Sequence, residues 1–472
     1  MEILTPSFEI NGSIPIYQQL YRYIKEEIKN GHIPYHTKLP SKRKLSSHLN
    51  ISQNTIQAAY DQLIEEGYIE SVEKKGYYVN KLDHLQNLRV LRTKEEDAQT
   101  REPQVLQYDY SYHGVDTAAF PFDTWRRLTR EVINEYDKEL LQLGDSSGLP
   151  RLRHVIASYL HQSRGVNCTE NQIIISSGTE MLFQSIIQLF DKNYMYGIEN
   201  PGYERLNQLF RGNRASYTSI RIDENGMIPE EIERSRPNVL CITPAHQFPS
   251  GQIMPINRRI QILNWANQEV DRYIIEDDYD SEFKYSGKPI PALQGIDENE
   301  KVIYMGSLSK SISPTLRVSY MVLPSHLLIR YRKELSYQLC PVPIIEQKVL
   351  CRFIEEGYFE RHLNKMRNIY KRKRELLVDS IQRIDPDIRI LGADAGLHLL
   401  IQVPVKMSEE QLILSASSYG VRVYKCSTYY SNRNEIPEKP TILLGYAMIT
   451  EKEIEASCKL LQKAWYPTKN SF

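Results

Sequence analysis

Apolar residues near the start of the chain recur with the spacing of a helix that buries one face. They are three or four positions apart, which places them on one side of an α-helix: Tyr17, Leu20, Tyr21, Ile24 and Ile28. Gly31 follows the last of them, and glycine is common just past helix ends. The pattern therefore predicts an amphipathic helix that ends at about Gly31.

Two more helices and two strands are predicted before residue 80. Ser41 is a suitable N-cap for a helix through Leu49, and Ser52 is one for a second helix through Glu65. Two short β-like runs follow a glycine, over Tyr68–Val72 and Tyr77–Val79. Three helices followed by a β-ribbon describe a winged helix-turn-helix, a small α+β module over residues 1–80.

From residue 105 to the end, short apolar runs alternate with helical patterns. Each run is followed by a turn rich in Gly, Pro or Ser: Ile173–Ser176, Val239–Thr243, Tyr273–Asp277 and Val302–Met305. This alternation predicts a large α/β domain over residues 105–472 with a mainly parallel sheet. Residues 81–104 carry mixed charges and no aromatic residue, and we expect them to form a solvated linker.

Composition narrows the class of protein further. The 472 residues include 59 Lys and Arg against 59 Asp and Glu, and such neutrality argues against nucleic-acid binding unless the charge is clustered. The six cysteines are scattered without a CxxC pair, so no metal site is predicted and a reducing compartment is favoured. No signal peptide and no apolar run of membrane-spanning length occur, so we expect a cytoplasmic protein without a membrane partner.

The charge is indeed clustered on the predicted module. Helix-turn-helix proteins read bases with the first residues of their second helix, which here supply Gln53, Asn54, Thr55 and Gln57. Basic side chains that could neutralise phosphates, and hydroxyls at the two helix starts, complete the expected contacts: Lys42, Arg43, Lys74, Lys75, Ser41 and Ser52. The pattern favours a double-stranded DNA operator as a partner, although a solvated helical hairpin would show the same periodicity.

A lysine among hydroxyl residues follows one of the predicted strands of the large domain. The strand over Val302–Met305 leads into Ser307, Ser309 and Lys310, and Arg317 comes seven residues after the lysine. Such a lysine can form a Schiff base with an aldehyde cofactor, while hydroxyls and an arginine donate to its phosphate. The segment suits a pyridoxal phosphate site, although a loop lysine is more often a surface residue.

Acidic residues end a second predicted strand. The run Tyr273–Ile275 continues into Glu276, Asp277, Asp278, Tyr279 and Asp280, where open α/β sheets bind ligands. A carboxylate there can keep a pyridinium nitrogen protonated, and a tyrosine hydroxyl can bind the ring 3-oxygen. A metal-binding acidic cluster or a solvated turn would give the same local pattern.

A third strand leads into a helix start with anion-binding character. Ser177, Gly178 and Thr179 come directly after the run Ile173–Ser176 and before a helical pattern. Backbone N–H groups and the dipole of a helix N-terminus favour a phosphate at this place. An ordinary helix cap would have the same sequence.

The first 80 residues resemble the GntR-type winged helix-turn-helix of bacterial transcription regulators. The matching positions include Leu39, Pro40, Ser41, Arg43, Leu45, Leu49, Ser52, Thr55, Ala59, Tyr60, Leu63, Glu66, Gly67, Tyr68 and Gly76. Gln53 stands where that family commonly has arginine, so the operator sequence does not carry over from the resemblance.

The large domain resembles the fold-type I aminotransferases, with the three motifs in the expected order. The resemblance implies that Lys310 is the Schiff-base lysine of pyridoxal phosphate, that Asp277 pairs with the pyridine nitrogen and Tyr279 with the 3-oxygen, and that Tyr203 stacks on the ring. It implies a phosphate site formed by Ser177, Gly178, Thr179, Ser307, Ser309 and Arg317. Two departures are that the tyrosine comes two rather than three residues after Asp277, and that Phe248 replaces an asparagine before Pro249.

Together the two parts resemble the MocR/GabR family, in which a GntR-type module is fused to an aminotransferase-like domain. The resemblance implies a homodimer and a small amine or amino-acid effector, whose carboxylate would meet Arg205. A second arginine that holds the carboxylate of γ-aminobutyrate in this family is matched here by Thr428. We therefore expect γ-aminobutyrate to be a weak effector at most, because a charge-assisted pair is lost.

Three functions compete at this stage. The first is a transcription regulator that senses a small amine, an amino acid or pyridoxal phosphate itself. The second is an active aminotransferase that carries a DNA-binding module, with Lys310 also acting as the general base. The third is a DNA-binding protein on a cofactor-free scaffold, against which the presence of Lys310, Asp277 and Arg317 argues.

Overall fold

The chain divides into two compact units in the computed structural model, Met1–Glu102 and Pro103–Phe472. The structure describes residues 6, 8–9, 14–82, 106–134, 138–285 and 290–467. The linker predicted over residues 81–104 lies almost entirely outside the described residues. None of the helices in the described part of the chain is long and apolar enough to cross a membrane.

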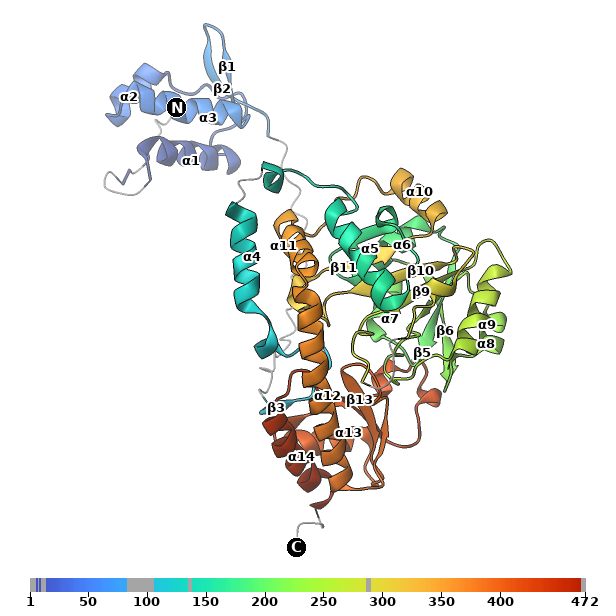
Figure 1. The fold of residues 1–472 in the computed structure, drawn as a ribbon. Coiled ribbons are helices and arrows are strands. Elements are labelled where there is room, and N and C mark those ends of the chain that lie inside the picture. Colours follow the sequence, from blue (N-terminus) through green and yellow to red (C-terminus); the bar gives the residue numbers. More distant parts are fainter. Residues whose placement is uncertain are drawn as a thin grey trace. The chain divides into compact units, whose positions relative to one another are not determined.

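The first unit is the predicted winged helix-turn-helix (Figure 1). Its elements are α1 (Ile16–Lys29), α2 (Lys42–Leu49), α3 (Gln53–Glu65) and the antiparallel strands β1 (Ile69–Val72) and β2 (Gly76–Val79). The hydroxyl of Ser41 accepts a hydrogen bond from the Lys44 N–H, and that of Ser52 accepts one from the Thr55 N–H, so both predicted caps are confirmed. Each strand differs by one residue from its predicted start.

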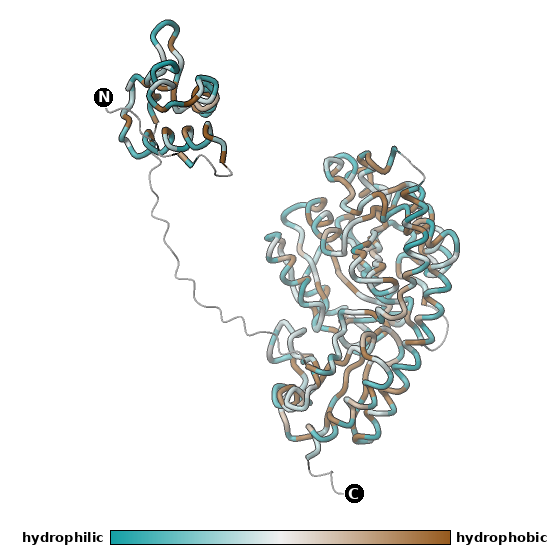
Figure 2. Tube along the Cα trace, turned by 90° about the vertical axis from the view of Figure 1, so that its left-hand side faces the viewer, coloured by the Kyte–Doolittle hydropathy of each residue, from teal (hydrophilic) through white to brown (hydrophobic). Residues whose placement is uncertain are grey.

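The apolar stripes of the three helices form the core of this unit. Leu20 and Ile24, two of the positions predicted for the inner face of α1, are fully buried, and so is Ile56 of α3. Tyr60 is also buried, and its hydroxyl donates to the Pro40 carbonyl oxygen at 3.0 Å, which ties α3 to the start of α2. Figure 2 shows the resulting alternation of teal and brown along the helices.

An eight-stranded, mainly parallel sheet is the centre of the second unit. Its spatial order is β4-β11-β10-β9-β8-β5-β6-β7, with β10, β9, β8, β5 and β6 mutually parallel and β11 and β7 antiparallel to their neighbours. The strands are β4 (Ile173–Ser176), β5 (Met195–Asn200), β6 (Ser216–Asp223), β7 (Gly226–Met227), β8 (Val239–Ile242), β9 (Tyr273–Asp278), β10 (Val302–Ser307) and β11 (Ser319–Val322). The four predicted apolar runs are therefore confirmed as strands.

Helices cover both faces of this sheet, which explains why its strands read as continuous apolar runs. Along β4, Ile173 and Ile175 pack into the core that includes α5 (Pro150–Arg164), whereas Ile174 packs into the core that includes α6 (Thr179–Leu189). The other helices of this part are α4 (Phe122–Asn134), α7 (Glu204–Gly212), α8 (Pro229–Ser235), α9 (Ile256–Asn267), α10 (Ser325–Glu334) and α11 (Ile344–Glu355).

The 27-residue helix α12 (Tyr358–Ile384) leads from this layer to a smaller C-terminal part (Figure 1). A four-stranded sheet there has the order β12-β13-β16-β15. Its strands are β12 (Arg389–Leu391), β13 (His398–Gln402), β15 (Tyr424–Lys425) and β16 (Thr441–Gly445); α13 (Glu409–Ser418), α14 (Glu451–Trp465) and a short pair of β3 (Tyr108–Asp109) with β14 (Val421–Arg422) complete it.

A buried ion pair joins α5 to the acidic end of β9. The Arg164 Nε lies 2.7 Å from the Asp278 Oδ2, and both side chains are almost fully buried. Tyr304 of β10 donates to the same carboxylate oxygen at 2.6 Å. A buried charge without its partner is costly, so the pair fixes the helix and the strand to one another.

We predict that Arg164→Leu lowers the free energy of unfolding of the second unit by about 3–5 kcal/mol, because Asp278 keeps its charge without a cation. Urea unfolding followed by tryptophan fluorescence measures this, since all three tryptophans, Trp125, Trp265 and Trp465, lie in the second unit. Arg126→Ala, which removes an exposed pair with Asp123, is the control and should change little. Equal effects of the two substitutions would contradict the prediction.

Candidate functional site

A cavity of about 260 Å³ lies where the carboxyl ends of the parallel strands meet in the second unit. Its lining includes ten of the residues predicted from the sequence: Gly178, Thr179, Tyr203, Arg205, Asp277, Tyr279, Ser307, Ser309, Lys310 and Arg317. Ser177 is half-buried and is absent from the lining residues. Segments more than 200 residues apart along the chain thus meet at one cavity.

Lys310 follows the end of β10, and its amino group lies against the loop after β3. The Nζ donates to the Tyr112 carbonyl oxygen. Burial lowers the pKa of Lys310 to about 8, while the charge of Asp280 acts in the opposite direction. A larger share of this lysine is therefore the free amine, which is the nucleophilic form.

Asp277 is the acidic residue of β9 that faces the cavity. Side chains alternate along a strand, so Glu276 and Asp278 lie on the other face, where Glu276 accepts from the Leu293 and Gln294 N–H groups. The Asp277 Oδ1 is buried and has no hydrogen-bond partner within the described residues. Burial, then the charges of Asp278 and Glu199, raise the pKa of Asp277 to about 7.

An anion-binding cup forms where α6 begins beside the turn after β10. Gly178 has a φ of 86°, a backbone conformation that favours glycine, and a Cβ there would lie 2.0 Å from the Arg317 Nη2, so the guanidinium would have to move. The first N–H groups of α6, the Ser309 hydroxyl and Arg317 all border the cavity. In this structure Arg317 pairs with the carboxylate of Glu180 at 2.8 Å.

Aromatic side chains form another wall of the cavity. Tyr203 lies just before α7 and contacts the edge of Phe248, with ring centroids 5.8 Å apart. Phe248 also packs on Tyr112 and Tyr429, at 5.3 and 4.9 Å. The phenylalanine that replaces the expected asparagine is therefore part of an aromatic cluster, and it offers no hydrogen bond to a ligand.

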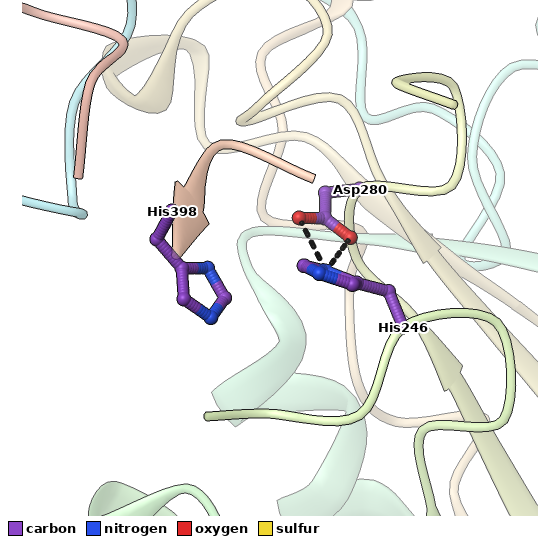
Figure 3. Close-up of side chains that lie close together, drawn as sticks. All are labelled: His246, Asp280 and His398. Carbon is purple, nitrogen blue, oxygen red and sulfur yellow. Dashed lines mark hydrogen bonds and ion pairs between the residues drawn. The ribbon is translucent and has the colours of Figure 1, made fainter. Parts of the chain in front are cut away.

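A buried histidine–aspartate pair beneath the cavity was not predicted from the sequence (Figure 3). The His246 Nδ1 lies 3.0 Å from both carboxylate oxygens of Asp280 and 2.9 Å from the Tyr279 hydroxyl. His398 of β13 is close by, with its ring centroid 5.1 Å from that of His246. The tyrosine predicted to meet the 3-oxygen is thus part of a hydrogen-bond network that the acidic strand alone does not reveal.

His246, Asp280 and His398 are also close enough together to be metal ligands, since one ligand atom of each lies within 4.8 Å of the others. Their hydrogen bonds favour a polar network instead. The His246 Nδ1 is hydrogen-bonded to Asp280, and the His398 Nε2 is hydrogen-bonded to the Pro249 carbonyl oxygen at 3.1 Å. Burial lowers the pKa of His398 well below its usual value, so this ring is neutral near pH 7.

Arg205 is predicted to bind an effector carboxylate and Thr428 to replace a second arginine that would bind it, and the two residues lie in different surroundings. Arg205, in the first turn of α7, lines the cavity and lies 3.9 Å from the Glu180 carboxylate. Thr428 is exposed, donates to the Lys425 carbonyl oxygen at 3.0 Å and is not among the lining residues. The expectation that Thr428 replaces a carboxylate-binding arginine stays a prediction.

On the first unit, the predicted DNA contacts fall into two groups. Ser41, Ser52 and Thr55 take part in helix capping, and Lys42 donates to Gln57, which also binds Asp61. The remaining side chains are exposed: Arg43, Gln53, Asn54, Lys74 and Lys75. Lys74 has a φ of 59° at the tip of the ribbon, which fits a tight turn. The exposed group is free to contact DNA.

The residues around the cavity fit pyridoxal phosphate. The unpartnered Asp277 oxygen suits a protonated ring nitrogen, the cup at Gly178 and Arg317 suits a phosphate, and the free amine of Lys310 suits an aldehyde. When bound, this cofactor supplies an aldehyde for primary amines and an electron-withdrawing ring. The roles of Tyr203 and Tyr279 toward it remain predictions.

Comparisons with known proteins agree with the two-unit organisation. Residues 109–460 match the family of class I and II aminotransferases, and residues 16–79 match the bacterial regulatory proteins of the gntR family. Kynurenine aminotransferase of Pyrococcus horikoshii shares the fold of the large unit, with a TM-score of 0.68 at 24% identity over 77% of this chain and 91% of that one.

The following two relatives align with both units of this chain, and both are named as regulators. An uncharacterised HTH-type transcriptional regulator of Bacillus subtilis, YdeL, is 40% identical over 98% of this chain and 99% of its own length. The probable rhizopine catabolism regulatory protein MocR of Rhizobium meliloti is 30% identical over 98% and 96%. The chain belongs to the MocR subfamily, in which a GntR-type DNA-binding module is fused to a pyridoxal phosphate-dependent, aminotransferase-like domain.

We predict that the cofactor-free protein takes up pyridoxal phosphate at a rate that rises about tenfold per pH unit below pH 8 and levels off above it. The free amine of Lys310 is the reactive form, and its pKa of about 8 determines the pH at which the rate of uptake levels off. Borohydride added at intervals fixes the attached cofactor, which mass spectrometry then counts.

Two variants control this measurement. Lys310→Ala should show no fixed cofactor at any pH, and replacement of the exposed Lys192 by alanine should behave as the parent protein. A rate that continues to rise up to pH 10, as an ordinary lysine would give, contradicts the prediction.

Proposed function

We propose that the protein is a transcription regulator that binds an operator through its winged helix-turn-helix and senses a small primary amine, an amino acid or pyridoxal phosphate in its aminotransferase-like domain. The observation that carries the proposal is the cavity of the second unit, where a buried, easily deprotonated lysine meets an unpartnered carboxylate and an anion cup. This site belongs to a chain that also carries a DNA-binding module.

In this proposal Lys310 holds the cofactor and an incoming amine competes with Lys310 for it. Release of the lysine would change which groups Lys310, Tyr112 and the His246–Asp280 pair contact. A ligand can shift a protein only by its different affinity for two arrangements, and these contacts are where the two arrangements would differ. We further propose that the regulator works as a cytoplasmic homodimer.

An active aminotransferase is the second candidate function. The intact set of Lys310, Asp277 and Arg317 favours it. Phe248 counts against it, because it replaces a side chain that would stabilise the 3-oxygen by a hydrogen bond. Keto-acid-dependent turnover distinguishes the two, since an enzyme completes many cycles with an amino donor whereas a sensor completes few.

We predict that Lys310→Ala binds operator DNA with the affinity of the parent protein but no longer changes that affinity when an amine effector is added. The reason is that the substitution removes the covalent link without touching the first unit, where the DNA contacts lie. Fluorescence anisotropy with labelled operator measures both properties. A Lys310→Ala protein that responds to the effector as before would refute the sensor role.

For DNA itself, we predict that Arg43→Ala weakens binding to all sequences alike and lowers the slope of log affinity against log salt by about 0.9, because one phosphate contact is lost. Gln53→Ala should instead relax the preference for operator over random DNA. Lys29→Ala is the charge-matched control, since its amino group lies over the Tyr68 ring, just past the far end of α3. An unchanged salt slope in Arg43→Ala would count against the proposed contact.

A further inference from the structure

We propose that Glu180 neutralises Arg205 and thereby makes the cavity select primary amines that lack a carboxylate. This inference rests on the proposed sensing function and specifies the effector class. Glu180, which was not among the residues predicted from the sequence, lies between Arg205 and Arg317 at the border of the cavity.

Glu180 lies in the first turn of α6, directly after the glycine–threonine pair of the anion cup. One of its carboxylate oxygens is 2.8 Å from the Arg317 Nη2, and the other is 3.9 Å from the Arg205 Nη1. All three side chains line the same cavity. One carboxylate therefore bridges the arginine of the phosphate cup and the arginine expected to meet an effector carboxylate.

The bound cofactor would leave Glu180 with Arg205 alone. Its phosphate would take Arg317 and the N-terminus of α6, and a phosphate repels a neighbouring carboxylate. Glu180 cannot stay on Arg317 without that repulsion, whereas Arg205 is already within reach. The positive charge of Arg205 is then balanced by the protein's own acid rather than left for a ligand.

An amine that carries a carboxylate has to displace Glu180 from Arg205 and to lie beside its negative charge. A plain alkylamine meets no such obstacle. The remaining wall offers apolar contacts from Tyr112, Phe248 and Leu397, which suit a hydrocarbon chain. The threonine predicted to replace a second carboxylate-binding arginine, Thr428, points to the same outcome, and Glu180 adds a reason that lies in the cavity itself.

A matched pair of probes tests this inference on the cofactor-loaded protein. n-Butylamine and γ-aminobutyrate both have four carbons and a terminal amine, and only the second has a carboxylate. We expect the absorption change of the bound cofactor to saturate at an at least tenfold lower concentration of n-butylamine. Titration of free pyridoxal phosphate with the same amines corrects for their intrinsic reactivity.

Variants locate the cause of the preference. Glu180→Gln should improve the apparent affinity for γ-aminobutyrate about tenfold and leave n-butylamine nearly unchanged. Arg205→Gln combined with Glu180→Gln should lose that gain, because the carboxylate then has no cation to bind. Cofactor content, measured by absorbance in alkali, confirms that each variant is loaded and folded.

The outcomes separate this inference from the function it rests on. If both amines shift the absorption but Glu180→Gln leaves their ratio unchanged, or if the parent protein prefers γ-aminobutyrate, the role of Glu180 is wrong and the sensor proposal stands. If the loaded protein responds to neither amine, this inference is refuted. The sensor proposal is then decided by whether pyridoxal phosphate itself changes operator affinity, and it is refuted as well if the cofactor does not.

Discussion

Four carboxylates at the end of one buried strand have to be compensated inside the second unit, and most of the site follows from that constraint. Glu276 is held by two backbone N–H groups, Asp278 by Arg164 and a tyrosine hydroxyl, and Asp280 by His246. Asp277 and Asp278 each keep one buried oxygen without a hydrogen-bond partner in the described part of the chain, and of the two only Asp277 lines the cavity. An uncompensated buried carboxylate is costly, so Asp277 is the position at which a positively charged ring nitrogen adds stability.

The same constraint couples the separate parts of the unit. Arg164 comes from α5, His246 from the turn after β8, and Lys310 from the turn after β10, so each partner fixes a different segment around β9. Asp280 also opposes the loss of charge on Lys310. Asp280 stands three residues after Asp277, where aminotransferases usually have the tyrosine. It acts on Lys310 through its charge and on His246 through hydrogen bonds.

Local sequence was sufficient for the elements and for the central residues of the site. The strands β4, β8, β9 and β10 read as apolar runs because helices cover both of their faces. Asp277 lies near the end of β9, and Gly178 and Lys310 follow the ends of β4 and β10. Ser41 and Ser52 were predictable because a cap depends only on the next three residues. Chemistry that depends on one short segment is visible in that segment.

What the sequence did not reveal comes from tertiary contacts between distant segments. His398 lies more than 80 residues after Lys310, and Tyr112 almost 200 before it, yet both line its cavity. The spacing of apolar and polar residues along the chain does not predict that the His246 side chain contacts Asp280. In the same way, a short segment does not show that the Thr428 side chain faces solvent, and its correspondence to a carboxylate-binding arginine stays a prediction.

The zero net charge of the chain hides a difference between the two units in how their charged side chains are arranged. In the first unit, Arg43, Lys74 and Lys75 are exposed, whereas Lys25 is paired with Glu66. In the second, charges of both signs are paired around one cavity. A DNA surface works through charge that is left free, whereas a selective amine site works through charge already balanced, as the Glu180 carboxylate balances Arg205 and Arg317. On the proposed functions, the distribution of ion pairs, and not the net charge, determines that the first unit binds DNA and that the second discriminates between small ligands by a single carboxylate.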